Sequence, residues 1–199
     1  MCELLGLCFN TEVSFHLAFS GLKAGATDNP DGWGVAWYNE YGTQIVKESR
    51  PVLQSRLAEN IQEQLGARSR IFVSHIRRAT TGKVGYINTH PFYRRFNHKT
   101  WVFAHNGTID PNRLSFSSRE FIPIGETDSE IIFCSLLSWL HHRSIQLTNS
   151  KGFRLLHNKL REINRSGELN LIFSNSRQLF AYHDRLGHVG LHFLLRQAP

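Results

Sequence analysis

The sequence has few cysteines, and no run of apolar residues reaches the ~18 that would predict a membrane span. Its three cysteines, Cys2, Cys8 and Cys134, are an odd number without a C-x-x-C pair. This pattern argues against a disulfide framework and against a zinc ribbon. The first residues carry no basic segment of the kind that opens a signal peptide. We therefore expect free thiols, no membrane partner and a cytoplasmic protein.

Metal-binding patterns are also missing. The chain has eleven histidines, but none of them forms an H-E-x-x-H or H-x-H cluster. The adjoining pair His141-His142 falls at an expected helix end, where the two side chains point apart. The sequence therefore predicts neither a metal site nor a cofactor.

Composition places the chain among ordinary globular proteins. It has 199 residues, of which 41% are hydrophobic, and no low-complexity tract, repeat or linker. We expect one domain, spanning residues 2–199. The net charge of +7 suggests a nucleic-acid partner, but the basic residues are scattered and pair only as Arg77-Arg78 and Arg94-Arg95. We expect no nucleic-acid partner, and a non-catalytic basic binding module remains an alternative.

Hydrophobic periodicity predicts alternating hairpins and helices, which is typical of an α/β or α+β protein. A strand opens with Asp31-Gly32-Trp33-Gly34 and runs through Tyr38. Further strands are predicted at 2–9, 43–48, 71–73, 101–104, 169–174 and 178–182, whereas residues 83–99 read as largely irregular.

Helices are predicted at 14–22, from Pro51 to a cap at Gly66, at 128–142 and at 153–164. Thr127-Asp128-Ser129-Glu130 has the form of a capping box before the third helix. The apolar positions expected to face the core are Leu53, Leu57, Ile61 and Leu65 in the second helix, Ile131, Ile132, Leu136 and Leu140 in the third, and Leu155, Leu156, Leu160 and Ile163 in the fourth.

Cys2 directly follows Met1, and a cysteine there is small enough to allow removal of Met1. The mature terminus would then carry a thiol beside an α-amine that titrates at about pH 7.7–8.0. A terminal amine of this kind can act as the base for a nucleophile. Taken alone, Cys2 is as well explained as a small apolar residue that starts a buried strand.

Six motifs occur along the chain, beginning with the one that contains Cys2, and several stand where a strand or helix begins or ends. They are Met1-Cys2-Glu3-Leu4-Leu5-Gly6, Asp31-Gly32-Trp33-Gly34, His75-Ile76-Arg77-Arg78-Ala79-Thr80, Thr89-His90-Pro91-Phe92, His105-Asn106-Gly107 and Thr127-Asp128-Ser129-Glu130. In this order they resemble the class II, or N-terminal-nucleophile, glutamine amidotransferases, and among them the small standalone type without a fused synthase domain. The resemblance implies an α+β fold, a four-layer αββα sandwich in which Cys2 starts a central strand.

The resemblance also implies a role for each motif. Cys2 is the expected nucleophile, and the Asn106 side chain with the Gly107 N–H is the expected oxyanion hole. Arg77, with its planar fork, and Thr80 are expected to bind the substrate carboxylate, and Asp128 the substrate ammonium. Asp31, Gly34 and His90 are expected to support the site, with His75 and His105 structural.

Simpler interpretations of these residues remain open. Arg77 alone could form a structural ion pair. Asn106-Gly107 is also a strong hairpin signal. Asp128 lies in a first helical turn, where an acid favours the helix dipole.

The implied activity is hydrolysis of glutamine to glutamate and ammonia, for an unidentified acceptor or a synthase partner subunit. Cleavage of another γ-glutamyl amide or peptide is the nearest alternative. Two features depart from the family. Asp28 stands where the wider class often has arginine, and the chain ends before the family's domain does. We therefore expect the C-terminal part of the sandwich to be lacking, with exposed sheet edges or apolar patches.

Overall fold

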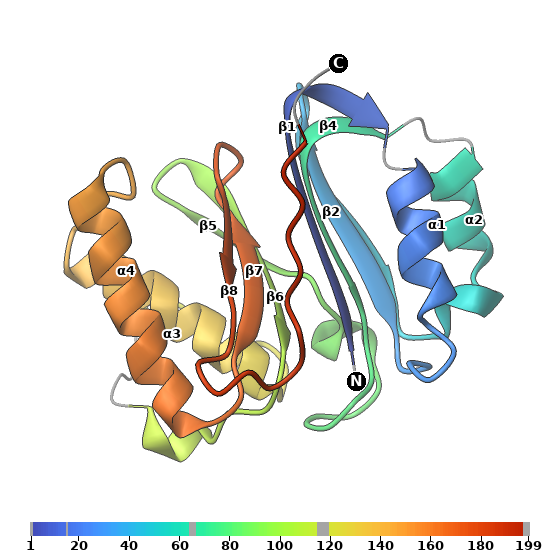
Figure 1. Ribbon diagram of the computed structural model, residues 1–199. Coiled ribbons are helices and arrows are strands. Elements are labelled where there is room, and N and C mark those ends of the chain that lie inside the picture. Colours follow the sequence, from blue (N-terminus) through green and yellow to red (C-terminus); the bar gives the residue numbers. More distant parts are fainter. Residues whose placement is uncertain (1, 15, 64–66, 115–119, 197–199) are drawn as a thin grey trace.

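The computed structural model describes residues 2–14, 16–63, 67–114 and 120–196. Two antiparallel four-stranded sheets stack face to face, and two helices cover the outer face of each (Figure 1). The layers run from α1 and α2 through the two sheets to α3 and α4. The αββα sandwich expected from the sequence is therefore confirmed.

The first sheet and its helices come from the first half of the chain. Its strands are β1 (Glu3–Ser14), β2 (Trp33–Asn39), β3 (Gly42–Glu48) and β4 (Arg68–Ile76), in the order β1-β4-β2-β3. Helices α1 (His16–Ala24) and α2 (Arg56–Glu63) cover it. Side chains alternate along a strand, so Trp33, Val35 and Trp37 face these helices and join Phe19 and Ile61 in one core.

The second sheet and its helices follow. The strands are β5 (Phe92–Phe96), β6 (Lys99–Asn106), β7 (Asn170–Ser174) and β8 (Leu179–Tyr182), in chain order across the sheet. Helices α3 (Asp128–His142) and α4 (Ser150–Ile163) cover its outer face. Phe103 of β6 stacks on Phe133 of α3 with ring centroids 5.1 Å apart, at the centre of this larger core.

The layer between the sheets is built from smaller side chains. Ala36 and Val73 of the first sheet meet Val102, Ala104 and Ile172 of the second. Four short 3-10 turns, at Val52–Gln54, Tyr86–Asn88, Pro111–Arg113 and Asn164–Ser166, complete the secondary structure of the described residues. Among the helices that the structure describes, none is both long and apolar enough to cross a membrane.

Several predicted elements are confirmed and others are wrong. The third predicted helix has the observed bounds, and the hairpins at β2–β3 and β7–β8 are present. The stretch 83–99 is not largely irregular, because it contains β5. The helix expected from Pro51 begins only at Arg56, and Leu53 is 53% exposed in the preceding turn. Leu65 and Gly66 lie outside the described residues.

Two predictions about burial and strand position are also wrong. Leu155 of α4 is 40% exposed, because the core-facing stripe of this helix runs through Leu156, Leu160 and Ile163. Cys2 does not start a central strand, since β1 pairs only with β4 in the described part of the sheet. The strand between neighbours is β4, whose second half is buried on both faces.

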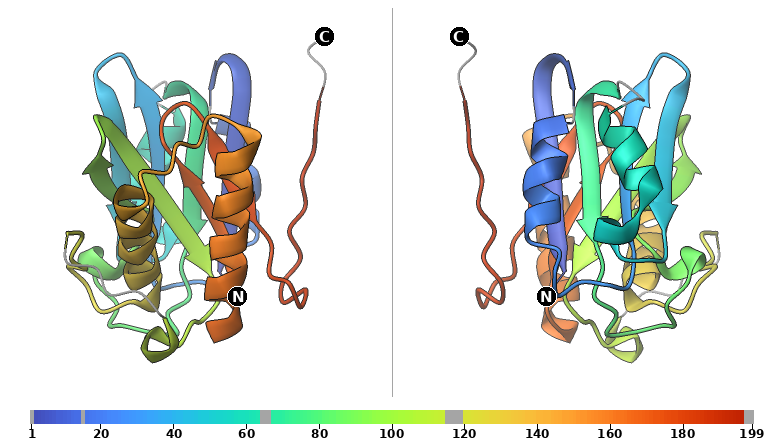
Figure 2. Two further views of the ribbon diagram at one scale, coloured as in Figure 1. Left: turned by 90° about the vertical axis from the view of Figure 1, so that its left-hand side faces the viewer. Right: turned by 90° about the vertical axis from the view of Figure 1, so that its right-hand side faces the viewer.

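The described chain ends in an extended segment after β8, without helix or strand from residue 183 to residue 196. It runs beside the sandwich rather than within it (Figure 2). Phe193, Leu194 and Leu195 are 93%, 72% and 87% exposed. This segment therefore presents apolar side chains to solvent.

Close packing of Gly34 against the loop before β5 gives a test of the fold. A Cβ atom at Gly34 would lie 2.3 Å from the His90 carbonyl oxygen, whereas a Cβ at Gly21 in α1 would meet nothing within 4 Å. We expect Gly34→Ala to lower the free energy of unfolding by about 3 kcal/mol through overpacking. Gly21→Ala should raise it by about 0.5–1 kcal/mol, because alanine favours a helix. Urea unfolding of both variants measures this, and equal changes would contradict the packing described here.

Candidate active site

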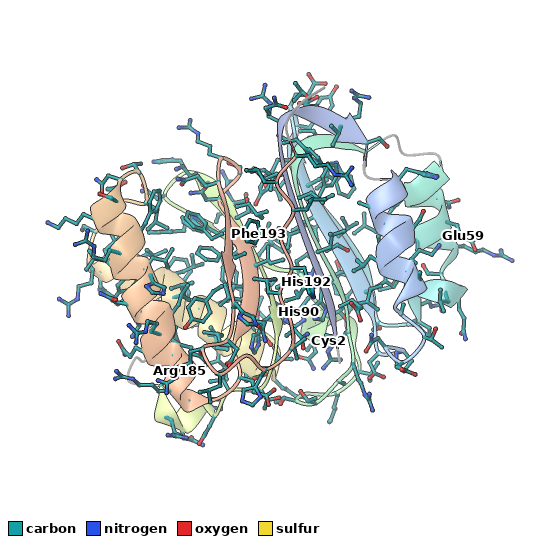
Figure 3. The ribbon with its side chains drawn as sticks, in the orientation of Figure 1. Cys2, Glu59, His90, Arg185, His192 and Phe193 are labelled. Carbon is teal, nitrogen blue, oxygen red and sulfur yellow. The ribbon has the colours of Figure 1, made fainter. Side chains whose placement is uncertain are left out.

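Cys2 lies at the end of the sandwich where β1 begins, against the residues that follow β4. Glu3 pairs with Ile76, so Cys2 stands opposite the turn out of β4. The Cys2 Sγ atom accepts a hydrogen bond from the Arg78 N–H at 3.1 Å and lies 3.3 Å from the Arg78 carbonyl oxygen. Figure 3 labels Cys2 and His90 at this end of the two sheets. The thiol is thus held by backbone atoms, whatever the side chain at position 78.

Asp31 fixes the chain around the sulfur. Its N–H donates to the Arg77 carbonyl at 3.1 Å, and the Arg77 N–H donates to the Gly32 carbonyl at 2.7 Å. The Asp31 carboxylate accepts from the Ala79 N–H at 2.7 Å. These bonds extend the β2–β4 ladder past its last pair, and they hold Asp31 against the residues that contact the Cys2 sulfur.

The Arg77 side chain is 3% exposed and lies under the loop that follows it. Its Nη2 donates to the carbonyls of Thr81 and Gly82 at 2.9 and 3.2 Å, and Nη1 donates to that of Lys83 at 3.4 Å. Because a guanidinium has five N–H groups, these bonds leave two for a ligand. Arg77 forms no ion pair with a carboxylate among the described residues, and it anchors the 81–83 loop.

Asn106 ends β6 beside Cys2, and Gly107 is the first residue after the strand. The Asn106 Nδ2 donates to the Cys2 carbonyl at 2.8 Å, which ties the start of β1 to the second sheet. Gly107 has φ +151°, and a Cβ atom there would lie 2.1 Å from the Glu168 carbonyl oxygen, so only glycine fits. The pair does not form a hairpin turn, because the chain continues into the loop before α3.

Asp128 begins α3 and points back to this loop. It is 3% exposed, and its Oδ2 accepts from the Ile109 N–H at 2.8 Å. Thr127 caps the helix, accepting from the Glu130 N–H at 3.2 Å. The capping box is only half formed, because the Glu130 carboxylate binds the N–H groups of Ile124 and Gly125 and the Arg94 guanidinium.

Thr80 and His90 make contacts to different elements. The exposed Thr80 hydroxyl is 3.3 Å from that of Thr108, which joins the loop after β4 to the loop after β6. His90 is 4% exposed, and its ring lies between the sheets with its centroid 4.2 Å from that of the His75 ring. None of the four ring nitrogens of His75 and His90 has a hydrogen-bond partner among the described residues. These rings pack in the wall of the site.

Burial controls the charges of this region. It raises the pKa of the Cys2 thiol, which the Arg78 N–H and the Arg77 charge partly oppose. Burial also lowers the pKa of Arg77, against the opposing effects of Asp31, Cys2 and Asp128. The same cause lowers the pKa of His75 to about 3 and that of His90 well below its ordinary value. Cys2 therefore needs a base, and neutral His75 and His90 cannot supply a positive charge.

The structure thus brings the sequence-predicted residues together from separate elements: Cys2, Asp31, Arg77, Thr80, Asn106, Gly107 and Asp128 surround one end of the sandwich, with Gly34 and His90 behind them. No group of three or more His, Cys, Asp or Glu side chains in the described ranges could hold a metal ion. The arrangement offers a thiol, an amide donor, a cation and a carboxylate, which suits acyl transfer.

Sequence reasoning missed some members of this site. Arg78 contributes only through its backbone, which no side-chain pattern reveals. Lys47 of β3 is 8% exposed and donates to the Thr89 carbonyl at 2.7 Å, so it holds the loop that carries His90. Burial lowers the pKa of Lys47 to about 8. The alternation of side chains along β3 could have indicated the burial of Lys47, because Lys47 lies on the same face of the strand as Ile45, toward the second sheet.

The comparisons with known proteins agree on one family. The profile described as "Glutamine amidotransferases class-II" matches residues 1–199. An uncharacterized protein of Methanocaldococcus jannaschii is 42% identical over 100% of this chain and 55% of its own length. The Escherichia coli protein named "Putative glutamine amidotransferase YafJ" is 34% identical over 100% of this chain and 78% of its own. The chain thus spans about half the length of the first of these relatives.

A solved structure shares the fold. The crystal structure of a predicted glutamine amidotransferase from Pseudomonas aeruginosa superposes with a TM-score of 0.63 at 29% identity, over 92% of this chain and 72% of that one. The layered sandwich is therefore that of a known fold.

The buried histidines make a test of this geometry. Because the folded-state pKa of His75 is about 3, below the ordinary 6.5, the unfolded chain binds the extra proton first as pH falls. Stability is therefore complete above about pH 6.5 and falls toward pH 3. Because of this lowered pKa, we expect the free energy of unfolding to be about 2 kcal/mol smaller at pH 5 than at pH 7. Urea unfolding at both pH values measures this loss.

The matched variants are His75→Gln and, as control, His157→Gln on the exposed face of α4. The pH-dependent loss should shrink in the first variant and remain in the second. NMR of the His75 ring should show a neutral imidazole down to pH 5. A protonated His75 at pH 6 would contradict the burial described here.

Proposed function

The chain belongs to the class II glutamine amidotransferases, and we propose that it hydrolyses the side-chain amide of glutamine with Cys2 as the nucleophile. The observation that carries this proposal is the position of the Cys2 sulfur. The sulfur accepts a hydrogen bond from the Arg78 N–H, and the Asn106 side-chain amide donates to the Cys2 carbonyl at 2.8 Å. The proposed nucleophile and the proposed oxyanion donor thus lie side by side, which supports the proposal.

The charged groups of glutamine have matching partners. The two free N–H groups of Arg77 would bind the substrate carboxylate, assisted by the Thr80 hydroxyl. The Oδ1 atom of Asp128 would accept from the ammonium, since Oδ2 already holds the Ile109 N–H. Glutamine held at this end would point its carboxamide at Cys2, so that attack is effectively unimolecular.

The first step needs a base, because burial raises the pKa of the Cys2 thiol. With Met1 removed, the α-amine of Cys2 takes the thiol proton, directly or through a water molecule. The thiolate then attacks the carboxamide carbon, and the carbonyl oxygen becomes an oxyanion. The second N–H of the Asn106 amide and the Gly107 N–H would stabilise that oxyanion.

The C–N bond breaks next. The ammonium of Cys2 returns its proton to the leaving nitrogen, ammonia departs, and a Cys2 thioester remains. Water, deprotonated by the same amine, attacks the thioester carbon. The C–S bond then breaks, glutamate leaves, and the thiol regains its proton.

The ammonia would serve an acceptor or a partner subunit, and one surface suits such a partner. Val84, Tyr86, Ile87, Ile122 and Ile124 are 52%, 58%, 51%, 70% and 71% exposed. The two loops that carry them meet beside the site, where the Glu126 N–H donates to the Asn88 side chain at 2.8 Å. Exposed apolar patches of this kind mark docking surfaces.

We also propose a reducing, cytoplasmic location, in keeping with free thiols at Cys2, Cys8 and Cys134.

The first test concerns Cys2. We expect Cys2→Ala to abolish ammonia release from glutamine and Cys2→Ser to leave at most a trace, because a hydroxyl is much harder to ionise. A diazo-ketone glutamine analogue should add one label to the native protein and none to Cys2→Ala, measured by intact mass. Cys8→Ala, a matched thiol removal at an exposed position, should label normally.

The substrate range and the removal of Met1 are tested in two further experiments. Glutamine and γ-glutamyl dipeptides share the head group, so their relative kcat/KM assigns the leaving group. A form in which Met1 is retained should be nearly as inactive as Cys2→Ala, since an amide nitrogen is no base near neutral pH. Equal activity with and without Met1 would overturn the terminal-amine mechanism. Absence of turnover on all γ-glutamyl amides would overturn the proposed function.

The second test concerns Asn106. We expect Asn106→Ala to lower kcat by about 10²–10³, the usual effect of removing one oxyanion donor, with a smaller change in KM. Asn112→Ala, on the exposed turn before α3, should leave both constants unchanged. Steady-state kinetics and a thermal melt of each variant separate catalysis from folding. A variant with normal kcat would exclude Asn106 from the oxyanion hole.

A further inference from the structure

Asp184 lies just after β8 and is buried without a positively charged partner. It is 2% exposed, and no ion pair between residues that the structure describes includes it. Its carboxylate contacts Asn164, which caps the C-terminal end of α4, where the helix dipole disfavours a negative charge. A buried charge in such a place costs stability unless hydrogen bonds compensate it. The hydrogen bonds that Asp184 makes therefore indicate its role.

Neutral N–H groups compensate this carboxylate. Its Oδ2 atom accepts from the Leu169 N–H at 3.0 Å and from Asn164 Nδ2 at 2.5 Å, and its Oδ1 atom accepts from the Leu186 N–H at 2.8 Å. The Asp184 N–H donates to Asn170 Oδ1 at 3.1 Å. Burial acts to raise the pKa of Asp184, but the N–H groups hold this pKa below its ordinary value. Asp184 is therefore charged, and it holds two neighbouring residues, Leu169 and Asn170, at the start of β7.

The segment that Asp184 holds pairs with the loop that carries Gly107. The pairs follow one antiparallel register: Asn106 with Asn170, Thr108 with Glu168, Ile109 with Gly167 and Asp110 with Ser166. The same register sets Gly107 opposite Leu169. Gly107 packs closely on this segment, since a Cβ atom there would lie 2.1 Å from the Glu168 carbonyl oxygen. Asp184 therefore fixes the strand against which Gly107 rests.

The pairing also sets the direction of the Gly107 N–H. Along two antiparallel strands, hydrogen-bonded and non-hydrogen-bonded residue pairs alternate. The Glu168 N–H donates to the Thr108 carbonyl at 2.9 Å, so the neighbouring pair, Gly107 with Leu169, is a non-hydrogen-bonded one. The N–H groups of this pair point away from each other. That of Leu169 goes to Asp184, and that of Gly107 goes to the opposite side.

The Ile109 N–H identifies that opposite side. Ile109 lies two residues after Gly107, so its N–H points the same way, and it donates to Asp128 Oδ2 at 2.8 Å. The Gly107 N–H therefore faces the side on which Asp128 lies, as the proposed mechanism requires. Asp128 holds the paired segments from this side, and Asp184 holds them from the other.

We propose that Asp184 is a positioning residue for the Gly107 N–H, which is a donor of the proposed oxyanion hole. Because it is buried, Asp184 would touch no substrate and would act through Leu169, the residue opposite Gly107. In Figure 3, the next residue, Arg185, and Cys2 both lie toward the lower end of the sandwich. This role rests on the proposed glutaminase function, and Asp184 lies outside the six motifs that indicated the site. A displacement of about 1 Å in such a site can lower a rate about 10²-fold.

Steady-state ammonia release from glutamine by the full chain tests this role. Asp184→Ala removes every bond to the carboxylate, and we expect it to lower kcat by about tenfold because the Gly107 N–H shifts. KM should change by less than about twofold, since Arg77 and Asp128 keep their own bonds. Asp184→Asn keeps one oxygen for the Leu169 N–H, so its kcat should stay within about threefold of the native value.

The matched control is Asn149→Ala, which removes the 2.9 Å hydrogen bond from the Gly152 N–H to the N-cap of α4. Asn149 and Asn164 flank a helix of 14 residues, so they lie about 21 Å apart. Asn149→Ala should lower the midpoint of a thermal melt, as Asp184→Ala does, and leave kcat unchanged. Equal losses of kcat in both variants would show that Asp184 acts only through stability, which would contradict the proposal.

The amide resonance of Gly107 in isotope-labelled protein gives a second readout that needs no substrate. It should move in Asp184→Ala and stay in place in Asn149→Ala. If Asp184→Ala does not fold, Asn164→Ala takes its place, because it removes one of the donors that hold the carboxylate. Its effects should have the same direction and be smaller. A folded variant with an unmoved Gly107 resonance or a native kcat would overturn the proposal.

The failure of the proposed function looks different in these experiments. Native protein that releases no ammonia from any γ-glutamyl amide would overturn the glutaminase function. The Gly107 resonance would then still decide whether Asp184 holds this N–H in place.

Discussion

The antiparallel pairing of β1 with β4 is the constraint on which the site depends. Its register sets Glu3 against Ile76, which leaves Cys2 opposite the first residues after β4. A shift of one residue would turn every β1 side chain to the other face of the sheet. Cys2 would then point at the helices α1 and α2 instead of the space between the sheets. The hydrogen bond from Asn106 to the Cys2 carbonyl adds a second fixed point from the other sheet.

The two sheets contribute different chemistry at their shared end. The first supplies the Cys2 thiol and, through the residues after β4, the cation Arg77. The second supplies the amide and the glycine after β6, and α3 adds Asp128. Asp128 also holds the Ile109 N–H, and Asp31 holds the Ala79 N–H. The loops that form the site are therefore each bound to a carboxylate, which fixes their shape without a bound substrate.

The sequence was sufficient for those parts of the fold that depend on local signals. Thr127 and the apolar spacing after it located α3. By resemblance, the motifs from Cys2 to Glu130 predicted the layers, and they named the residues that the structure brings together at one end of the sandwich. The sequence-based predictions were wrong where tertiary contacts determine the structure. The strand β5 has charged Arg94 and Arg95 within it, and Arg94 pairs with Glu130 some 36 residues away, which no local pattern shows. β1 lies at the edge of the described sheet, and β4 is the strand that is buried on both faces. Which strand is buried in this way depends on the packing of the whole sheet.

The three hydrogen bonds of Arg77 to the 81–83 loop bear on the thermodynamics of ligand capture. An arginine free in solvent loses about 2 kcal/mol of rotamer entropy when it is immobilised. In this protein that loss occurs during folding, since the loop already holds the guanidinium. A carboxylate that arrives at its two remaining N–H groups meets a donor whose orientation is set. The arginine is thus preorganised, and the free energy of its bond to a carboxylate goes into affinity rather than into ordering the side chain.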